Sequence, residues 1–295
     1  MNISLRIAQE LAVKQSQVEA AIILLDEGAT VPFIARYRKE VTNGLDDTQL
    51  RQLEERLTYL RELEDRRATI VKSIEEQKKL TPELKKEILQ ADTKTRLEDL
   101  YAPYKPKRRT KAQIAREAGI EPLLDAILDD PKQHPEILAE SYLNAKAGFE
   151  DPAAVLEGAR QIFMERASEN ADLVGQLRDY VWQHAQLTST VITGEKTKGA
   201  KFADYFDYAE PIKAVPSHRA LALFRGRDEG VLRIKLKIAG QDDLENISQL
   251  GVCDSMVAKH YSLSQQDRAA DTWLLESARL AWRAKISLRT DVELL

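Results

Sequence analysis

The chain has 295 residues, enough for roughly two domains and a substantial core. Its 44 Lys and Arg against 48 Asp and Glu give a formal charge of −4, which excludes a polycation that coats nucleic acid or an anionic membrane, so any basic site must be local. Charged residues at 31%, aromatics at 6%, and only 12 Gly and 10 Pro are typical of long helices and disfavour a large sheet.

The cysteine content and the apolar runs bear on the cellular compartment. The single cysteine, Cys253, excludes an internal disulfide and a thiolate metal cage. The N-terminus has no apolar core of a signal peptide, and the longest strongly apolar run, 20–25, is far shorter than the roughly 20 residues of a membrane helix. We therefore expect a cytoplasmic protein without a membrane segment.

The first 45 residues predict a small helical unit. Apolar residues over 5–39 recur mostly at three- and four-residue steps, which predicts three short helices in a helix-turn-helix-like layout. Ser16 and Glu19 form a capping-box pattern for the second helix, and Gly28 lies where a glycine commonly ends one. Because the second helix is acidic and apolar, we expect the unit to pack against protein and not to read base edges.

A long helix and a helical bundle are predicted for the next part of the chain. No Pro or Gly interrupts the seam of Leu and Ile over 46–79, and Pro82 suits the first position of a second, antiparallel helix. The Tyr101–Pro106 segment contains two prolines, so it cannot be regular helix and is predicted to be a rigid connector. Thr110 is expected to cap a helix to 118, and further helices are predicted over 121–129, 135–147, 153–167 and 170–187.

The last hundred residues mix patterns. The periodicity fades over 188–216, which predicts a long connection with one helical turn near 202–208. Ser217 is then expected to cap a helix to about Arg225, and the alternating run 231–238 is the one predicted strand. The helical pattern of 263–295 continues to the last residue, so the chain is expected to be part of something longer.

These patterns together predict a mainly α, multi-helical fold with a helix-turn-helix-like unit, a long central helix and one short β element. The predicted division is 1–45 for the N-terminal unit, 46–190 for the long helix and bundle, 191–262 for an irregular connection with a helix–strand unit, and 263–295 for the start of a helix leading to further domains.

No pattern of a catalytic or metal site is found in the sequence. The four histidines are isolated, and the paired carboxylates precede helical patterns or prolines, where acidic groups serve as caps. Residues 194–201 have two glycines at P-loop separation, but Ala200 stands where the lysine should directly follow. We therefore predict a protein that is not an enzyme and that needs no metal and no cofactor.

Basic residues that could contact nucleic acid form three groups. Because the first group adjoins two tyrosines on a proline-stiffened segment, it offers cations for phosphates and rings for stacking. The groups are Lys105, Lys107, Arg108, Arg109, Lys111 and Arg116 beside Tyr101 and Tyr104; Arg36, Arg38 and Lys39 after the aromatic-containing segment 31–34; and Arg219, Arg225, Arg227, Arg233, Lys235 and Lys237 around the predicted strand.

Each basic group also has a structural explanation. The first could pair with Glu98, Asp99 and Glu117 and brace the connector against the long helices, and the second group leaves the same choice open. Lys235 and Lys237 would share the polar face of the strand, where lysines also protect a sheet edge from pairing with other chains.

Three segments resemble the signature segments of the bacterial Tex family of transcription accessory proteins. They are residues 29–40 (ATVPFIARYRKE), 97–110 (LEDLYAPYKPKRRT) and 216–227 (PSHRALALFRGR), in the family's order. The resemblance covers essentially the whole chain and implies the N-terminal helical scaffold of such a protein. A full-length member continues into a YqgF-type domain with an RNase H-like fold, a helix-hairpin-helix region and a C-terminal OB-fold RNA-binding domain.

The resemblance also implies a function in transcription and RNA metabolism, with RNA or DNA bound non-specifically through the backbone. Because the family's principal nucleic-acid-binding module is the OB-fold domain, binding by the present residues is expected to be weak, with the transcription machinery as a further expected partner. Tyr101, Tyr104 and the basic residues at 105 and 107–109 become the first candidates for a supporting contact. The alternative is a protein-interaction scaffold without nucleic-acid affinity of its own.

Overall fold

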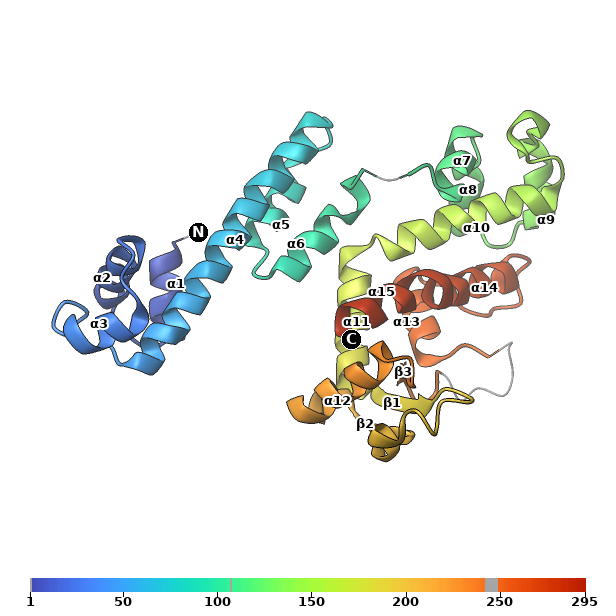
Figure 1. The fold of residues 1–295 in the computed structure, drawn as a ribbon. Coiled ribbons are helices and arrows are strands. Elements are labelled where there is room, and N and C mark those ends of the chain that lie inside the picture. Colours follow the sequence, from blue (N-terminus) through green and yellow to red (C-terminus); the bar gives the residue numbers. More distant parts are fainter. Residues whose placement is uncertain (1, 107, 242–248) are drawn as a thin grey trace. The chain divides into compact units, whose positions relative to one another are not determined.

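The computed structural model describes residues 2–106, 108–241 and 249–295. The chain forms two compact units, Met1–Tyr104 and Lys105–Leu295. Both consist mainly of helices, and a small sheet lies in the second unit (Figure 1), which confirms the predicted fold class. The four-part division by residue ranges stays a prediction.

Three short helices open the first unit. They are α1 (Ile3–Glu10), α2 (Gln15–Asp26) and α3 (Val31–Tyr37), and each packs against the long helix α4 (Asp47–Glu76). Gly28 has a φ of 90° just after α2, as a helix-ending glycine should. The predicted capping box at Ser16 and Glu19 is wrong. Because α2 already begins at Gln15, the Gln17 side chain takes that place and accepts the Lys14 amide hydrogen at 2.9 Å.

Helix α4 organises the rest of the first unit. Asp46 caps it by accepting the Gln49 amide hydrogen at 2.7 Å. The buried residues of α4 recur mostly every three or four positions and so form one face of the helix. Helices α5 (Pro82–Gln90) and α6 (Lys94–Tyr101) pack against it. Regular helix ends at Tyr101, and a 3₁₀ turn, Ala102–Tyr104, takes the chain to the end of the unit. The buried apolar residues of α4 are Leu50, Leu53, Leu57, Leu60, Leu63, Ile70 and Ile74.

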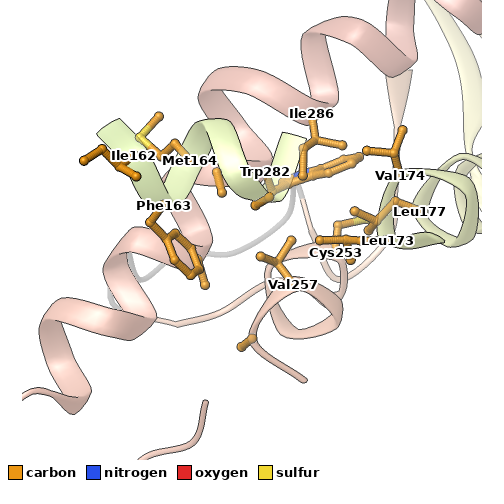
Figure 2. Close-up of a cluster of buried hydrophobic side chains, with 14 of the residues drawn as sticks. Ile162, Phe163, Met164, Leu173, Val174, Leu177, Cys253, Val257, Trp282 and Ile286 are labelled. Carbon is orange, nitrogen blue, oxygen red and sulfur yellow. The ribbon is translucent and has the colours of Figure 1, made fainter. Parts of the chain in front are cut away.

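The second unit is built around α10 (Pro152–Ser168), which contacts helices from both earlier and later parts of the unit. Figure 2 shows the buried side chains of this core, where Phe163 of α10 lies in one cluster with Val257 and Trp282. The other helices are α7 (Lys111–Glu117), α8 (Glu121–Asp129), α9 (Pro135–Ala139), α11 (Ala171–His184), α12 (Ser217–Asp228), α13 (Val252–His260), α14 (Asp271–Ala281) and α15 (Ser287–Leu294).

Several helix ends in the second unit differ from expectation. The predicted helix 135–147 is only α9 followed by two 3₁₀ turns, Glu140–Tyr142 and Ala145–Ala147. Ser217 is the first residue of α12 and makes no capping hydrogen bond, because Pro216 occupies the cap position. Between α14 and α15 the chain forms a π-helical turn, Trp282–Ile286.

The sheet contains two strands that the sequence analysis missed. The predicted strand is confirmed as β3 (Leu232–Lys237), and it pairs with β1 (Gln186–Val191), which in turn pairs with β2 (Asp207–Pro211). All pairs are antiparallel, and the order is β2-β1-β3. The prediction of helix and irregular chain at β1 and β2 is wrong because their pairing is non-local: Ser189 lies opposite Tyr208 on one side and Ile234 on the other. No described helix is both long and apolar enough to cross a bilayer.

Candidate nucleic-acid interface

The C-terminal end of α3 presents aromatic and basic side chains together. Val31 and Ile34 are buried, and the helix packs on α4, so the side chains of the opposite face point outward. Phe33 is 40% exposed and Tyr37 is 56% exposed, unusually open for aromatic rings. We call Phe33, Arg36, Tyr37, Arg38 and Lys39 the α3 patch.

The two rings and the two arginines of the α3 patch lie close to one another. The centroids of the Phe33 and Tyr37 rings are 5.4 Å apart. The Arg38 guanidinium carbon lies 5.3 Å from the Phe33 ring centroid, and that of Arg36 lies 6.0 Å from the Tyr37 centroid. In the part of the chain that the structure describes, Arg36, Arg38 and Lys39 form no ion pair with a carboxylate. Their charges therefore stay available to an anion beside exposed rings.

Tyr101, one of the two predicted stacking residues, is buried. Only 8% of it is exposed, and its hydroxyl hydrogen-bonds that of Ser73 at 2.9 Å. The Arg66 guanidinium carbon lies 5.5 Å from its ring centroid, while the Arg66 Nε donates to Glu98 Oε1 at 2.6 Å. The ring thus packs inside the first unit and does not offer an open face to a base.

The other predicted tyrosine, Tyr104, is half-buried. Its main-chain carbonyl accepts a hydrogen bond from the Gln77 side-chain amide at 2.9 Å. This contact ties the end of the first unit to Gln77, the residue that follows α4, and it does not involve the tyrosine ring.

The basic residues after the connector differ in their ion pairing and exposure. The Arg109 Nη2 lies 2.5 Å from Glu117 Oε2, and hydrogen bonds from Arg109 and Gln113 hold the pKa of Glu117 below its usual value. Arg108 and Lys111 are exposed, and within the described ranges neither has an ion-pair partner. Lys105 is exposed and makes an interaction of its own, and Lys107 lies outside the described residues. The bracing alternative therefore accounts for Arg109, with Glu117 as the partner that the sequence analysis named.

A buried carboxylate anchors the start of α7. Thr110 caps the helix by accepting the Gln113 amide hydrogen at 3.0 Å, and its own hydroxyl donates to Glu165 Oε1 at 3.0 Å. The other oxygen of Glu165 lies 2.5 Å from Arg116 Nη1. The segment that carries Arg108 and Lys111 is therefore fastened to the core helix α10.

The third basic group also divides in two. On α12, Arg219 pairs with Glu210 at 3.0 Å and Arg225 with Glu229 at 3.2 Å, so the helix cations are neutralised locally. The strand cations at 233, 235 and 237 are exposed and have no ion pair with any described residue. The sequence analysis did not predict β1, so it missed that these cations lie on one face of a sheet. Residues 186–191 (QLTSTV) carry no clear apolar alternation, since a buried position of this strand is Ser189, so no local signal marked it.

The described residues contain no group of three or more His, Cys, Asp or Glu side chains that could hold a metal ion. Cys253 is buried in the core of the second unit.

Family models match both ends of the chain. The Tex-like protein N-terminal domain matches residues 1–75, and the Tex central region-like model matches residues 130–295. The Transcriptional accessory protein Tex of Neisseria gonorrhoeae is 54% identical over 295 residues, and Protein YhgF of Escherichia coli strain K12 is 53% identical over 289 residues. The S1 RNA-binding domain-containing protein 1 of Homo sapiens is 29% identical over 226 residues, which are 74% of this chain and 22% of that protein.

The two bacterial alignments cover 100% and 98% of this chain but 38% and 37% of the relatives. The chain thus spans less than two fifths of the length of the curated proteins that it matches.

Proposed function

The chain belongs to the Tex family, and from that membership we propose that it is a non-enzymatic scaffold that binds RNA or DNA without sequence preference, with the α3 patch as its principal contact. The name of the human relative includes an RNA-binding domain, and the name of the Neisseria relative includes a transcriptional accessory function. Both names support a nucleic-acid partner in the setting of transcription, with the transcription machinery as a second partner. The cytoplasmic location expected from the sequence stays a prediction.

The observation that carries this proposal is the combination of unpaired cations and exposed rings at the end of α3. Non-specific binding of a single strand needs positive charge for the phosphates and a flat apolar surface for the bases. Phe33 and Tyr37 provide such a surface, and Arg36, Arg38 and Lys39 provide charge next to it. Arg108 and Lys111 add auxiliary phosphate contacts on the second unit.

The proposal predicts salt-sensitive binding that depends on the α3 cations. We expect fluorescence anisotropy of a labelled RNA strand of about 20 nucleotides to show micromolar affinity at roughly 50 mM salt, weakening as salt rises. Arg36→Gln, Arg38→Gln and Lys39→Gln together should weaken binding about tenfold. They should also reduce the slope of log affinity against log salt by about two, because each lost phosphate contact removes about 0.7.

A matched control has the same change of charge on the same unit. Lys72, Lys85 and Lys86 are exposed, and all three replaced by Gln should leave affinity within about twofold of the parent chain. Equal weakening by the control and the α3 variant would show that only net charge matters, and absence of binding by the parent at low salt would end the proposal.

A second candidate function is protein docking through the first unit. Ile23 is 58% exposed on α2, and Val41 is open just beyond the α3 patch, so apolar side chains are available to a protein partner. In that case Ile23→Ser and Val41→Ser would abolish capture of the partner, whereas the three Gln substitutions would leave it intact. The salt series distinguishes the two functions, since apolar docking has little dependence on salt.

A further inference from the structure

The three-stranded sheet has one face in the core and one face in solvent. On β3 the residues alternate, so Leu232 is buried while Arg233, Lys235 and Lys237 are exposed. Their partners across the sheet are on β1. Arg233 lies opposite Thr190, Lys235 opposite Thr188, and Lys237 opposite Gln186. We call these three cations the row. Its neighbours on β1 are uncharged polar side chains, and Asp207, which pairs with Thr190 on this face, lies one strand further away on β2.

The spacing of the row suits a nucleic-acid backbone. Alternate residues of an antiparallel strand are about 6.8 Å apart, since each residue advances about 3.4 Å. The backbone of an unpaired strand can follow a row of cations with this spacing, as it follows the positively charged grooves of proteins that bind single strands. These side chains form no ion pair with any described residue, so within the described ranges a phosphate displaces no carboxylate when it binds.

A cavity of about 480 Å³ adjoins the same strand. Lys235 and Leu236 of β3 line one side of it, and the π turn and α15 line the other. Since β3 is the last strand in the order β2-β1-β3, no described strand lies beside its outer edge. Trp282, Arg283, Leu288 and Asp291 are among the residues that line that second side.

The composition of the cavity fits a nucleobase with its phosphate. Its apolar lining includes Trp282 and Leu288, and its volume falls within the roughly 300 to 1,000 Å³ of small-molecule sites. Two cations, Lys235 and Arg283, oppose the single carboxylate of Asp291 at the lining. The Arg283 Nη2 lies 3.5 Å from Asp254 Oδ2, so a buried carboxylate orients its guanidinium. Bases fit such mixed surfaces through their flat faces, while phosphates bind the cations.

We propose that strand β3 and the adjoining cavity form a second nucleic-acid site, which takes an unpaired strand with its backbone along Arg233, Lys235 and Lys237 and one base in the cavity. Duplex DNA binds there more weakly, because a paired base would first have to leave the stack. The inference rests on the proposed nucleic-acid function but uses a different unit from the α3 patch.

The same row could act only as a guard of the sheet edge, since lysines there discourage pairing with other chains. That function needs neither the cavity nor Arg283, and it predicts the same affinity for single-stranded and duplex ligands before and after the substitutions. Replacing the three cations would then promote self-association without a change in nucleic-acid affinity.

The first test replaces the row in the whole chain. Arg233→Gln, Lys235→Gln and Lys237→Gln together are expected to weaken binding of a labelled oligouridylate of about 15 nucleotides at least fivefold and to lower the salt slope by about two. The control is Lys132→Gln, Lys146→Gln and Lys259→Gln, three exposed lysines of the same unit, which should stay within about twofold of the parent. Equal effects of the two sets would overturn the inference.

The second test addresses the cavity with a pair of variants on one helix. Leu288 lines the cavity and is 61% exposed, and Val292, one turn later on α15, is 83% exposed and is not among the lining residues. Leu288→Glu should weaken oligouridylate binding at least fivefold more than Val292→Glu, while both bind a blunt DNA duplex equally. The cavity site would be overturned if the two variants lost equal affinity for the oligouridylate, or if Leu288→Glu lost as much affinity for the duplex as for the oligouridylate. This comparison does not depend on whether the row variant aggregates.

The two proposals fail separately in this design. The α3 variant tests the first unit, and the row and cavity variants test the second. Loss of binding in the α3 variant alone would leave the proposed function intact and remove the β3 site. Loss in the row and cavity variants alone would keep the β3 site and remove the α3 patch as the principal contact.

Discussion

At the scale of single residues, Asp271 shows how hydrogen bonds outweigh burial. Its carboxylate is buried at the start of α14 and accepts the amide hydrogens of Gln266 at 2.7 Å and Arg268 at 3.0 Å, and the Arg268 Nε at 2.8 Å. Desolvation would raise the pKa of this group, but the hydrogen bonds prevail and hold the pKa below its usual value of 3.8. The ionised form therefore stabilises the folded state.

The sign of this pKa shift predicts the pH dependence. Because the pKa of Asp271 is lowered on folding, its contribution is present above the ordinary pKa and is lost as pH falls through the lower, folded value. Asp271→Asn should cost about 2 kcal/mol of unfolding free energy at neutral pH, the contribution of hydrogen bonds to a charged group, and less below about pH 4. Urea unfolding at several pH values measures the difference.

Asp129 offers the control for this pH series. It is exposed at the end of α8 and makes no interaction with another described side chain, so Asp129→Asn should change stability little at any pH. A constant gap between the parent and Asp271→Asn from neutral to acid pH would contradict the assignment.

At the scale of elements, the packing of α10 against α7 depends on Gly158. An added Cβ there would lie 2.8 Å from the Phe149 ring and 3.2 Å from the Cβ of Ala115, closer than side chains tolerate. Alanine in place of helical glycine gains about 1 kcal/mol of helix propensity, and overpacking of a core costs about 1 to 3 kcal/mol. We expect Gly158→Ala to destabilise the chain by about 1 kcal/mol in urea unfolding.

Gly175 on the neighbouring helix α11 is the matched control. An added Cβ there would meet no heavy atom within 4 Å, so only the propensity changes, and Gly175→Ala should stabilise the chain by about 0.5 to 1 kcal/mol. Opposite signs for the two substitutions support the packing argument, and a stabilising Gly158→Ala would refute it.

At the scale of the whole molecule, each unit has its own buried core. The three tryptophans, Trp182, Trp273 and Trp282, all lie in the second unit, so their fluorescence reports on that unit alone. Leu60 is fully buried on α4, and Leu60→Ala should cost about 2 to 5 kcal/mol through the lost contacts and the cavity left behind. We expect the helical signal in circular dichroism to fall at a lower urea concentration, while the tryptophan midpoint stays unchanged.

The reciprocal variant tests the same division. Ile162 is fully buried in the core of the second unit, and Ile162→Ala should shift the tryptophan midpoint by a comparable free energy. If Leu60→Ala shifts both signals together, the two units unfold as one cooperative body.

Local patterns account for what could be predicted of the fold. Helix α5 begins at Pro82 and helix α7 begins directly after Thr110, as predicted, because capping involves only neighbours along the chain. Strand β3 was predictable for the same reason, since its alternation is local. Strands β1 and β2 were not, because their pairing joins residues up to about fifty positions apart.

The candidate site shows the same difference between local and non-local features. The sequence by itself determined which segments carry cations and aromatic rings, and the family resemblance that these segments carry is confirmed. Only the tertiary structure decided that Tyr101 is buried, that Arg109 is held by Glu117 and that the α3 and β3 cations stay open. The physical reason is that composition and periodicity are properties of neighbouring residues, whereas exposure and ion pairing depend on which distant surfaces the fold brings into contact.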